Sequence, residues 1–131
     1  TMLPGTNRAA DRFARASFYI NAIPKKATSE HSLASVFSII RNVSVPFGLN
    51  TEEEPNISST RWRTVVDHKR KLYFFESAVS PNTFWIDLKD INFSGTQTLK
   101  LDLGKDQSNI YAGKANSHLK ATTAFKFLGI D

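Results

Sequence analysis

The spacing of the apolar residues changes along this chain from a helical period to an alternating one. Between residues 7 and 43, apolar side chains recur every three or four positions, which is the pattern of amphipathic helices. After residue 58 they alternate with polar side chains, which is typical of strands buried on one face. Because the helical segments come first and the strands follow, the sequence predicts an α+β fold: two helices followed by an antiparallel β meander.

The first helix is predicted over residues 7–22, and Pro24 ends it. It carries an apolar stripe and, beside that stripe, a cationic one. The apolar stripe consists of Ala9, Phe13, Ala16 and Ile20, and the cationic stripe of Arg8, Arg12, Arg15 and Tyr19. We expect Arg8 and Arg15 to be surface charges.

A second helix is predicted from Ser29, or from Thr28 as its cap, to about Val43. Its expected buried face contains Leu33, Val36, Phe37, Ile40 and Val43. An exposed acidic loop, NTEEEPN, follows the break at Pro46 and Gly48.

Four strands are predicted after this loop. The polar turn HKRK joins the first two, and the fourth is interrupted at Gly95. The strands are expected at residues 59–67, 72–79, 82–88 and 91–103. After residue 106 the pattern predicts either a short terminal helix or a strand.

Composition narrows the classes of function. The 131 residues suit one domain, and 40% hydrophobic content indicates a globular chain. The chain contains no cysteine, so a disulfide, a thiolate metal site and a cysteine nucleophile within it are excluded. No apolar run approaches the roughly 20 residues that a membrane span needs. The formal charge of +5 permits an anionic ligand or nucleic acid, but the cations are spread along the chain, which favours a basic surface.

Few residues form a motif for chemistry. His31, His68 and His118 fit no metal-ligand spacing, so we expect surface histidines, with no metal and no cofactor. Neither a G-x-S-x-G elbow nor a P-loop occurs. Thr1 could act as an N-terminal nucleophile with its own amine as the base, but the turn-like MLPG that follows it argues against this role.

Arg12 has two interpretations. Asp11 can pair with Arg15 at i+4 and with Arg8 at i−3, which would leave Arg12 as one more solvated charge. However, Arg12 stands beside Phe13, near the border of the apolar stripe. A partly desolvated guanidinium in that position can lower the pKa of a thiol or hold a carboxylate.

Three segments together resemble the C-terminal part of the choloylglycine hydrolase family, which contains conjugated bile salt hydrolases and penicillin V acylases. They are LPGTNRAADRFARASFY, SLASVFSIIRNVSVPFGLN and STRWRTVVDHKRKLYFFESAVSPNTFWIDLKDINFS. The resemblance covers about residues 3–103 and rests on their order and spacing.

The resemblance implies an N-terminal-nucleophile hydrolase with an αββα sandwich, in which a first-residue cysteine attacks a linear amide. One of the family's site arginines lies in an S-R-F segment after the LPG turn. Here that segment is ADRF, so the matched catalytic residue is Arg12, with Asp11 in place of the serine. The resemblance assigns no other site residue in this chain.

On this interpretation, residues 1–131 are the C-terminal portion of one domain, and the N-terminal portion with the nucleophile is absent. The expected partners are that missing segment and a small-molecule amide substrate: a conjugated bile acid, penicillin V or an acyl-homoserine lactone. A homo-oligomer is compatible with the family, whereas nucleic acid and a membrane span are not expected. The isolated chain is predicted to be inactive.

Two alternatives come from other classes of protein. A self-standing basic α+β binding module, for nucleic acid, predicts clustered surface cations and salt-dependent binding. A Thr1 amidase predicts that replacing Thr1 abolishes activity while Arg12 matters less.

Overall fold

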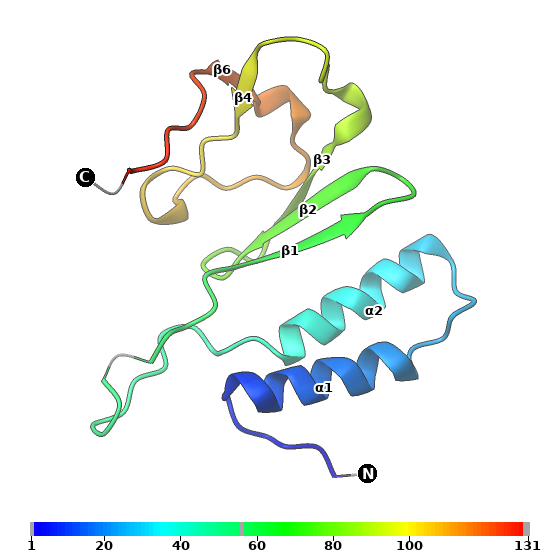
Figure 1. Cartoon of the computed structure of the whole chain (residues 1–131), viewed down its shortest axis with the longest axis vertical. Helices are drawn as coiled ribbons and strands as arrows, with labels where there is room; N and C mark the ends of the chain where they lie inside the picture. The colour runs from blue at the N-terminus through cyan, green and yellow to red at the C-terminus, as the bar shows by residue number, and fades with distance from the viewer. Residues whose placement is uncertain (1, 56, 130–131) are drawn as a thin grey trace.

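The computed structural model describes residues 2–55 and 57–129. It begins with a helical hairpin, in which α1 (Ala9–Ala22) and α2 (Ser29–Asn42) lie side by side (Figure 1). Thr28 caps α2, since its hydroxyl accepts a hydrogen bond from the backbone N–H of His31. Both predicted helices are therefore confirmed, with α1 starting two residues later than the pattern indicated.

An antiparallel meander follows the helices. It consists of β1 (Trp62–Asp67), β2 (Leu72–Ser77) and β3 (Thr83–Asp87), and the HKRK turn joins β1 to β2 as expected. A short strand, β5 (Gly113–Lys114), extends this sheet by pairing in parallel with β3. The two-helix, antiparallel-meander order confirms the α+β prediction.

The predicted fourth strand is wrong in extent and in place. Only β4 (Thr98–Lys100) is a strand, and it pairs with β6 (Lys120–Thr122) in a separate small sheet. The chain leaves the meander because η1 (Leu88–Asp90), a 3₁₀ turn capped by Asp87, follows β3 directly, and a turn around Gly95 comes next. The remaining 3₁₀ turns are η2 (Lys105–Gln107) and η3 (Asn116–His118).

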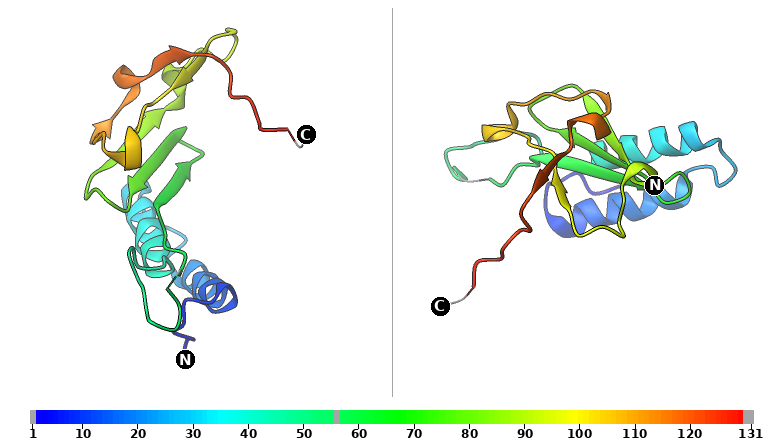
Figure 2. Two further views of the ribbon diagram at one scale, coloured as in Figure 1. Left: turned by 90° about the vertical axis from the view of Figure 1, so that its left-hand side faces the viewer. Right: turned by 90° about the horizontal axis from the view of Figure 1, so that it is seen from above.

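The meander is covered on both faces, by different parts of the chain. Helix α2 lies against one face, where Phe37 packs on Val65 and Phe74. The C-terminal segment covers the other face near β3, where Ala115 packs on Phe84 and Ile86. Figure 2 shows the end of the chain running away from this body as an extended tail.

Helix α1 does not bury its apolar stripe. Phe13 is 73% exposed and Ile20 is 52% exposed, whereas Arg15 is buried and Arg12 is half-buried. The reason is that α1 packs on α2 with the side that carries Arg12, while Arg15 is buried against the turn that precedes α1. Within the described residues, no helix is both long and apolar enough to span a membrane.

Candidate functional site

Arg12 lies where α1 meets the C-terminal end of α2. Its Nε donates a hydrogen bond to the carbonyl oxygen of Val43, the residue that caps α2, at 2.5 Å. Among residues 2–55 and 57–129, neither Nη nitrogen of Arg12 has a hydrogen-bond partner. The guanidinium is thus oriented through one nitrogen, and its outer edge remains available to another group.

Arg15 is buried, so the prediction that it is a surface charge is wrong. It is 8% exposed, and its Nη1 donates to the carbonyl oxygens of Pro4 at 2.8 Å and Thr6 at 2.9 Å. These carbonyls come from the turn that precedes α1 and replace the water that an exposed guanidinium would bind. Arg15 therefore holds the turn at Pro4 and Thr6 against helix α1 through two hydrogen bonds. Arg8 is exposed, as expected.

The expected ion pairs of Asp11 are also wrong. The carboxylate accepts a short hydrogen bond from the hydroxyl of Thr6, and among the described residues it forms no ion pair with Arg8 or Arg15. Thr6 precedes the helix and offers a closer, neutral donor at its first turn. In this position Asp11 belongs to the start of α1, and it does not neutralise the guanidinium of Arg12.

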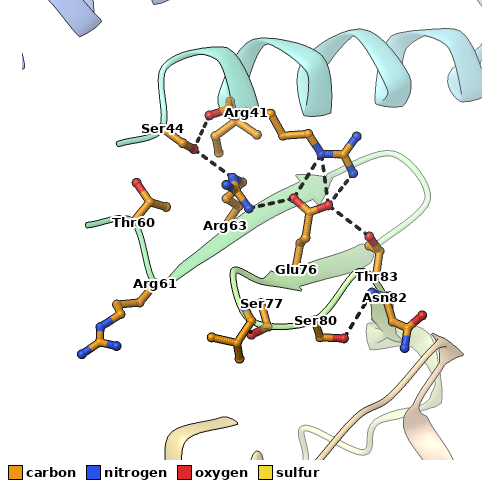
Figure 3. Close-up of polar contacts among 12 residues, drawn as sticks. Arg41, Ser44, Thr60, Arg61, Arg63, Glu76, Ser77, Ser80, Asn82 and Thr83 are labelled. Carbon is orange, nitrogen blue, oxygen red and sulfur yellow. Dashed lines mark hydrogen bonds and ion pairs between the residues drawn. The ribbon is translucent and has the colours of Figure 1, made fainter. Parts of the chain in front are cut away.

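A buried carboxylate lies between the meander and the end of α2. Glu76 of β2 is 6% exposed and accepts hydrogen bonds from Arg41 of α2 and Arg63 of β1 (Figure 3). Arg41 Nε lies 3.1 and 3.2 Å from the two carboxylate oxygens, and Arg63 Nη1 lies 3.3 Å from Oε2. Thr83 of β3 adds a hydroxyl contact at 3.5 Å. With two cations around it, the carboxylate can stay ionised although it is buried.

The hydrogen bonds from Arg41, together with the charges of Arg41 and Arg63, hold the pKa of Glu76 below its ordinary value of 4.5. Because the folded-state pKa is lowered, the stability that this carboxylate contributes is fully present above pH 4.5. It is lost as the pH falls through the lowered folded pKa.

We predict that Glu76→Gln removes this pH dependence. The difference in free energy of unfolding between the parent protein and the variant should be constant from about pH 7 to pH 5 and should shrink towards pH 3. Urea unfolding at several pH values measures it. A difference that grows on acidification would contradict the assignment.

The sequence predictions missed Glu76, Arg41 and Arg63. For Glu76 and Arg63, the alternation of apolar and polar residues along the strands contained an indication of burial. Glu76 shares a strand face with buried Phe74, and Arg63 shares one with buried Val65. Opposite charges on the apolar faces of consecutive strands indicate a buried ion pair once the two strands are paired.

The remaining residues that the sequence analysis considered for chemistry are the three histidines and Thr1. His31, His68 and His118 are exposed, which confirms them as surface histidines. Within the described ranges, no group of three or more His, Asp or Glu side chains is arranged to hold a metal ion. Thr1 lies outside the described residues.

The helix pair and the meander lie in a stretch of the chain that matches one family of enzymes. The profile of the linear amide C–N hydrolases, choloylglycine hydrolase family, matches residues 1–106. The chain therefore belongs to the choloylglycine hydrolase family, and the resemblance stated from the sequence is confirmed.

Among individual relatives, the chain is 57% identical over 143 residues to a penicillin V acylase from Pectobacterium atrosepticum. That match covers 98% of this chain and 38% of the relative. The solved structure of penicillin V acylase from Agrobacterium tumefaciens matches with a TM-score of 0.88 and 63% identity, over 98% of this chain and 41% of that one. A mutant conjugated bile acid hydrolase from Clostridium perfringens shares the fold, with a TM-score of 0.57 and 22% identity over 98% of this chain and 33% of that one.

Proposed function

We propose that this chain is the C-terminal portion of an amidase that hydrolyses linear amide bonds. The observation that carries the proposal is the match along nearly the whole chain to penicillin V acylases, at 57% and 63% identity. The chain spans only 38% and 41% of those proteins. The remainder of the active site is therefore assigned to a preceding segment of the same enzyme, and the isolated chain is expected to be inactive.

The nucleophile in this proposal is a cysteine at the start of the mature enzyme, as the family resemblance implies. It lies in another segment, because this chain contains no cysteine. Its α-amine takes the thiol proton, and the thiolate attacks the amide carbonyl. The C–N bond then breaks as the amine leaves with that proton, and water hydrolyses the thioester to release the acid and restore the free cysteine. Arg12 is the catalytic residue that this chain supplies. Its unpartnered guanidinium edge supports that role, because a fixed cation beside a thiol lowers the thiol pKa and favours the thiolate.

The substrate that the comparisons favour is penicillin V. Identity to the two penicillin V acylases is far higher than the 22% identity to the bile acid hydrolase. Conjugated bile acids and acyl-homoserine lactones are the competing amides. The net positive charge of the chain does not distinguish between these substrates, because several of them carry an anionic group.

The test begins with the intact mass of the protein as its source organism makes it. A polypeptide more than twice as heavy as 14.7 kDa, or a co-purifying one with an N-terminal cysteine, is the expected result. That protein is then incubated with penicillin V, glycine- and taurine-conjugated bile acids and an acyl-homoserine lactone, and product release is measured for each.

Faster release from penicillin V, and its loss after alkylation of the N-terminal cysteine, would support the proposal. Amide hydrolysis by residues 1–131 alone would overturn the assignment of the nucleophile to another segment. Release from bile acids but not from penicillin V would overturn the substrate.

A further inference from the structure

We propose that Glu76 and Arg63 are positioning residues for Arg12, acting through Ser44 and the peptide group that ends α2. The inference rests on the catalytic role proposed for Arg12. It concerns residues that lie on other elements of the fold, on the meander and on the turn after α2.

The first step is a row of polar side chains across the meander. Arg63 faces Glu76 across β1 and β2, and Glu76 faces Thr83 across β2 and β3. Because partners in register lie on the same face of the sheet, all three side chains lie on the face that α2 covers. The burial of Glu76 and its contacts to both neighbours fix the carboxylate, which in turn fixes the guanidinium of Arg63.

The second step crosses from the sheet to the turn after α2. Arg63 Nε donates to the hydroxyl oxygen of Ser44 at 2.8 Å. That hydroxyl donates its own proton to the carbonyl oxygen of Ile40 at 2.7 Å. The oxygen of Ser44 is therefore held between strand β1, from which it accepts a hydrogen bond, and the last turn of α2, to which it donates one.

The third step is a single peptide group. The carbonyl of Val43 and the N–H of Ser44 belong to the same planar unit, so fixing one side of it fixes the other. The N–H of Ser44 bonds to the carbonyl of Arg41 at 3.2 Å, and the carbonyl of Val43 accepts the Nε of Arg12. Ordered polar contacts thus lead from Glu76 to the guanidinium of Arg12.

A second ion-pair cluster also joins α2 to the meander but, among the described residues, has no hydrogen-bonded path to Arg12. At the other end of the β1–β2 hairpin, Arg70 binds Asp67 at 2.7 Å and Glu30 at 3.3 Å. This cluster also joins α2 to the meander, but at the N-terminal end of the helix, away from Val43. It serves as the matched control, since it joins the same two elements without a contact to the end of α2 that binds Arg12.

The experiment is a double-mutant cycle in the complete, nucleophile-bearing protein, with penicillin V as the substrate. Glu76→Gln is measured alone and combined with Arg12→Ala, and Asp67→Asn is treated in the same way. We expect Glu76→Gln alone to lower kcat about tenfold with KM changed less than about twofold, and to have almost no further effect once Arg12 is alanine. Asp67→Asn should change kcat by less than about twofold in both backgrounds.

Several outcomes would decide between positioning and simple stabilisation. Independent, multiplying losses for Glu76→Gln and Arg12→Ala would overturn the positioning role while leaving the proposed function intact. An unchanged kcat in Arg12→Ala would instead overturn the catalytic role proposed for Arg12, on which this inference rests, while the amidase activity itself would stand.

If Glu76→Gln fails to fold, Ser44→Ala cuts the same path while the buried ion pairs remain. We expect Ser44→Ala to lower kcat about threefold to tenfold, again only when Arg12 is present. A kcat for Ser44→Ala equal to that of the parent protein would overturn the proposal.

Discussion

Replacing Arg12 with alanine is expected to lower the kcat of the proposed complete amidase by about a hundredfold, with a much smaller change in KM. The reason is that the outer edge of the guanidinium has no partner among the described residues and is held in place by the carbonyl of Val43. In the proposed role such a cation favours the attacking thiolate and does not hold the substrate, so its loss affects turnover more than binding. Steady-state kinetics with penicillin V measures both constants.

The matched control is Arg15→Ala, one helical turn further along the same stripe. Because Arg15 binds the carbonyls of Pro4 and Thr6, we expect its loss to lower the free energy of unfolding by about 2 kcal/mol. The kcat of the molecules that remain folded should change by no more than a few-fold. Equal losses of kcat in the two variants would contradict the assignment of Arg12, whereas partial rescue by Arg12→Lys would support a role for its charge.

The largest expected effect on stability is that of Phe74→Ala, at about 3–4 kcal/mol. Phe74 is 5% exposed and lies at the centre of the interface between α2 and the meander. Its ring meets those of Phe37 and Trp85 at centroid distances of 5.9 and 5.6 Å. Truncation would remove these contacts and leave a cavity that the paired strands cannot close, because their register is held by backbone hydrogen bonds.

Phe74→Leu provides the graded comparison, since it keeps most of the volume and should cost less than about 1.5 kcal/mol. Urea unfolding of the complete protein measures both losses. A cost below about 1 kcal/mol for Phe74→Ala would show that this cluster is not the core of the α2–meander interface. A larger cost for leucine than for alanine would contradict the cavity argument.

The sequence predicted those features of the fold that depend on neighbours along the chain. Apolar spacing, the Thr28 cap and Pro24 placed both helices, and alternation placed the first three strands. The fourth strand was misplaced, because the apolar residues from 91 to 103 fit a strand equally well in the meander or in a separate sheet. Only the partner strand decides between them, and β6 lies about twenty residues further along the chain.

For the candidate site, too, the sequence predicted some features and left others to the tertiary structure. The ADRF segment was sufficient to single out Arg12 by resemblance, and the lack of metal-ligand spacing was sufficient to place the histidines on the surface. The periodicity of α1 did not tell which of its two stripes packs on α2. An amphipathic pattern indicates that one face will be covered, whereas the neighbouring element determines which face it is.

What the sequence determined by itself was thus the types and order of the two helices and the first three strands, together with the family. Tertiary structure alone decided that Arg15 is buried against two carbonyls and that Glu76 joins Arg41 and Arg63 beneath α2. It also brought Val43 to Arg12. The physical reason is that these polar groups acquire their partners only when the chain folds and packing excludes the water that would otherwise bind them. Arg41 and Glu76, 35 residues apart, meet when α2 packs on the meander, and Arg12 and Val43, 31 residues apart, meet when α1 packs on α2.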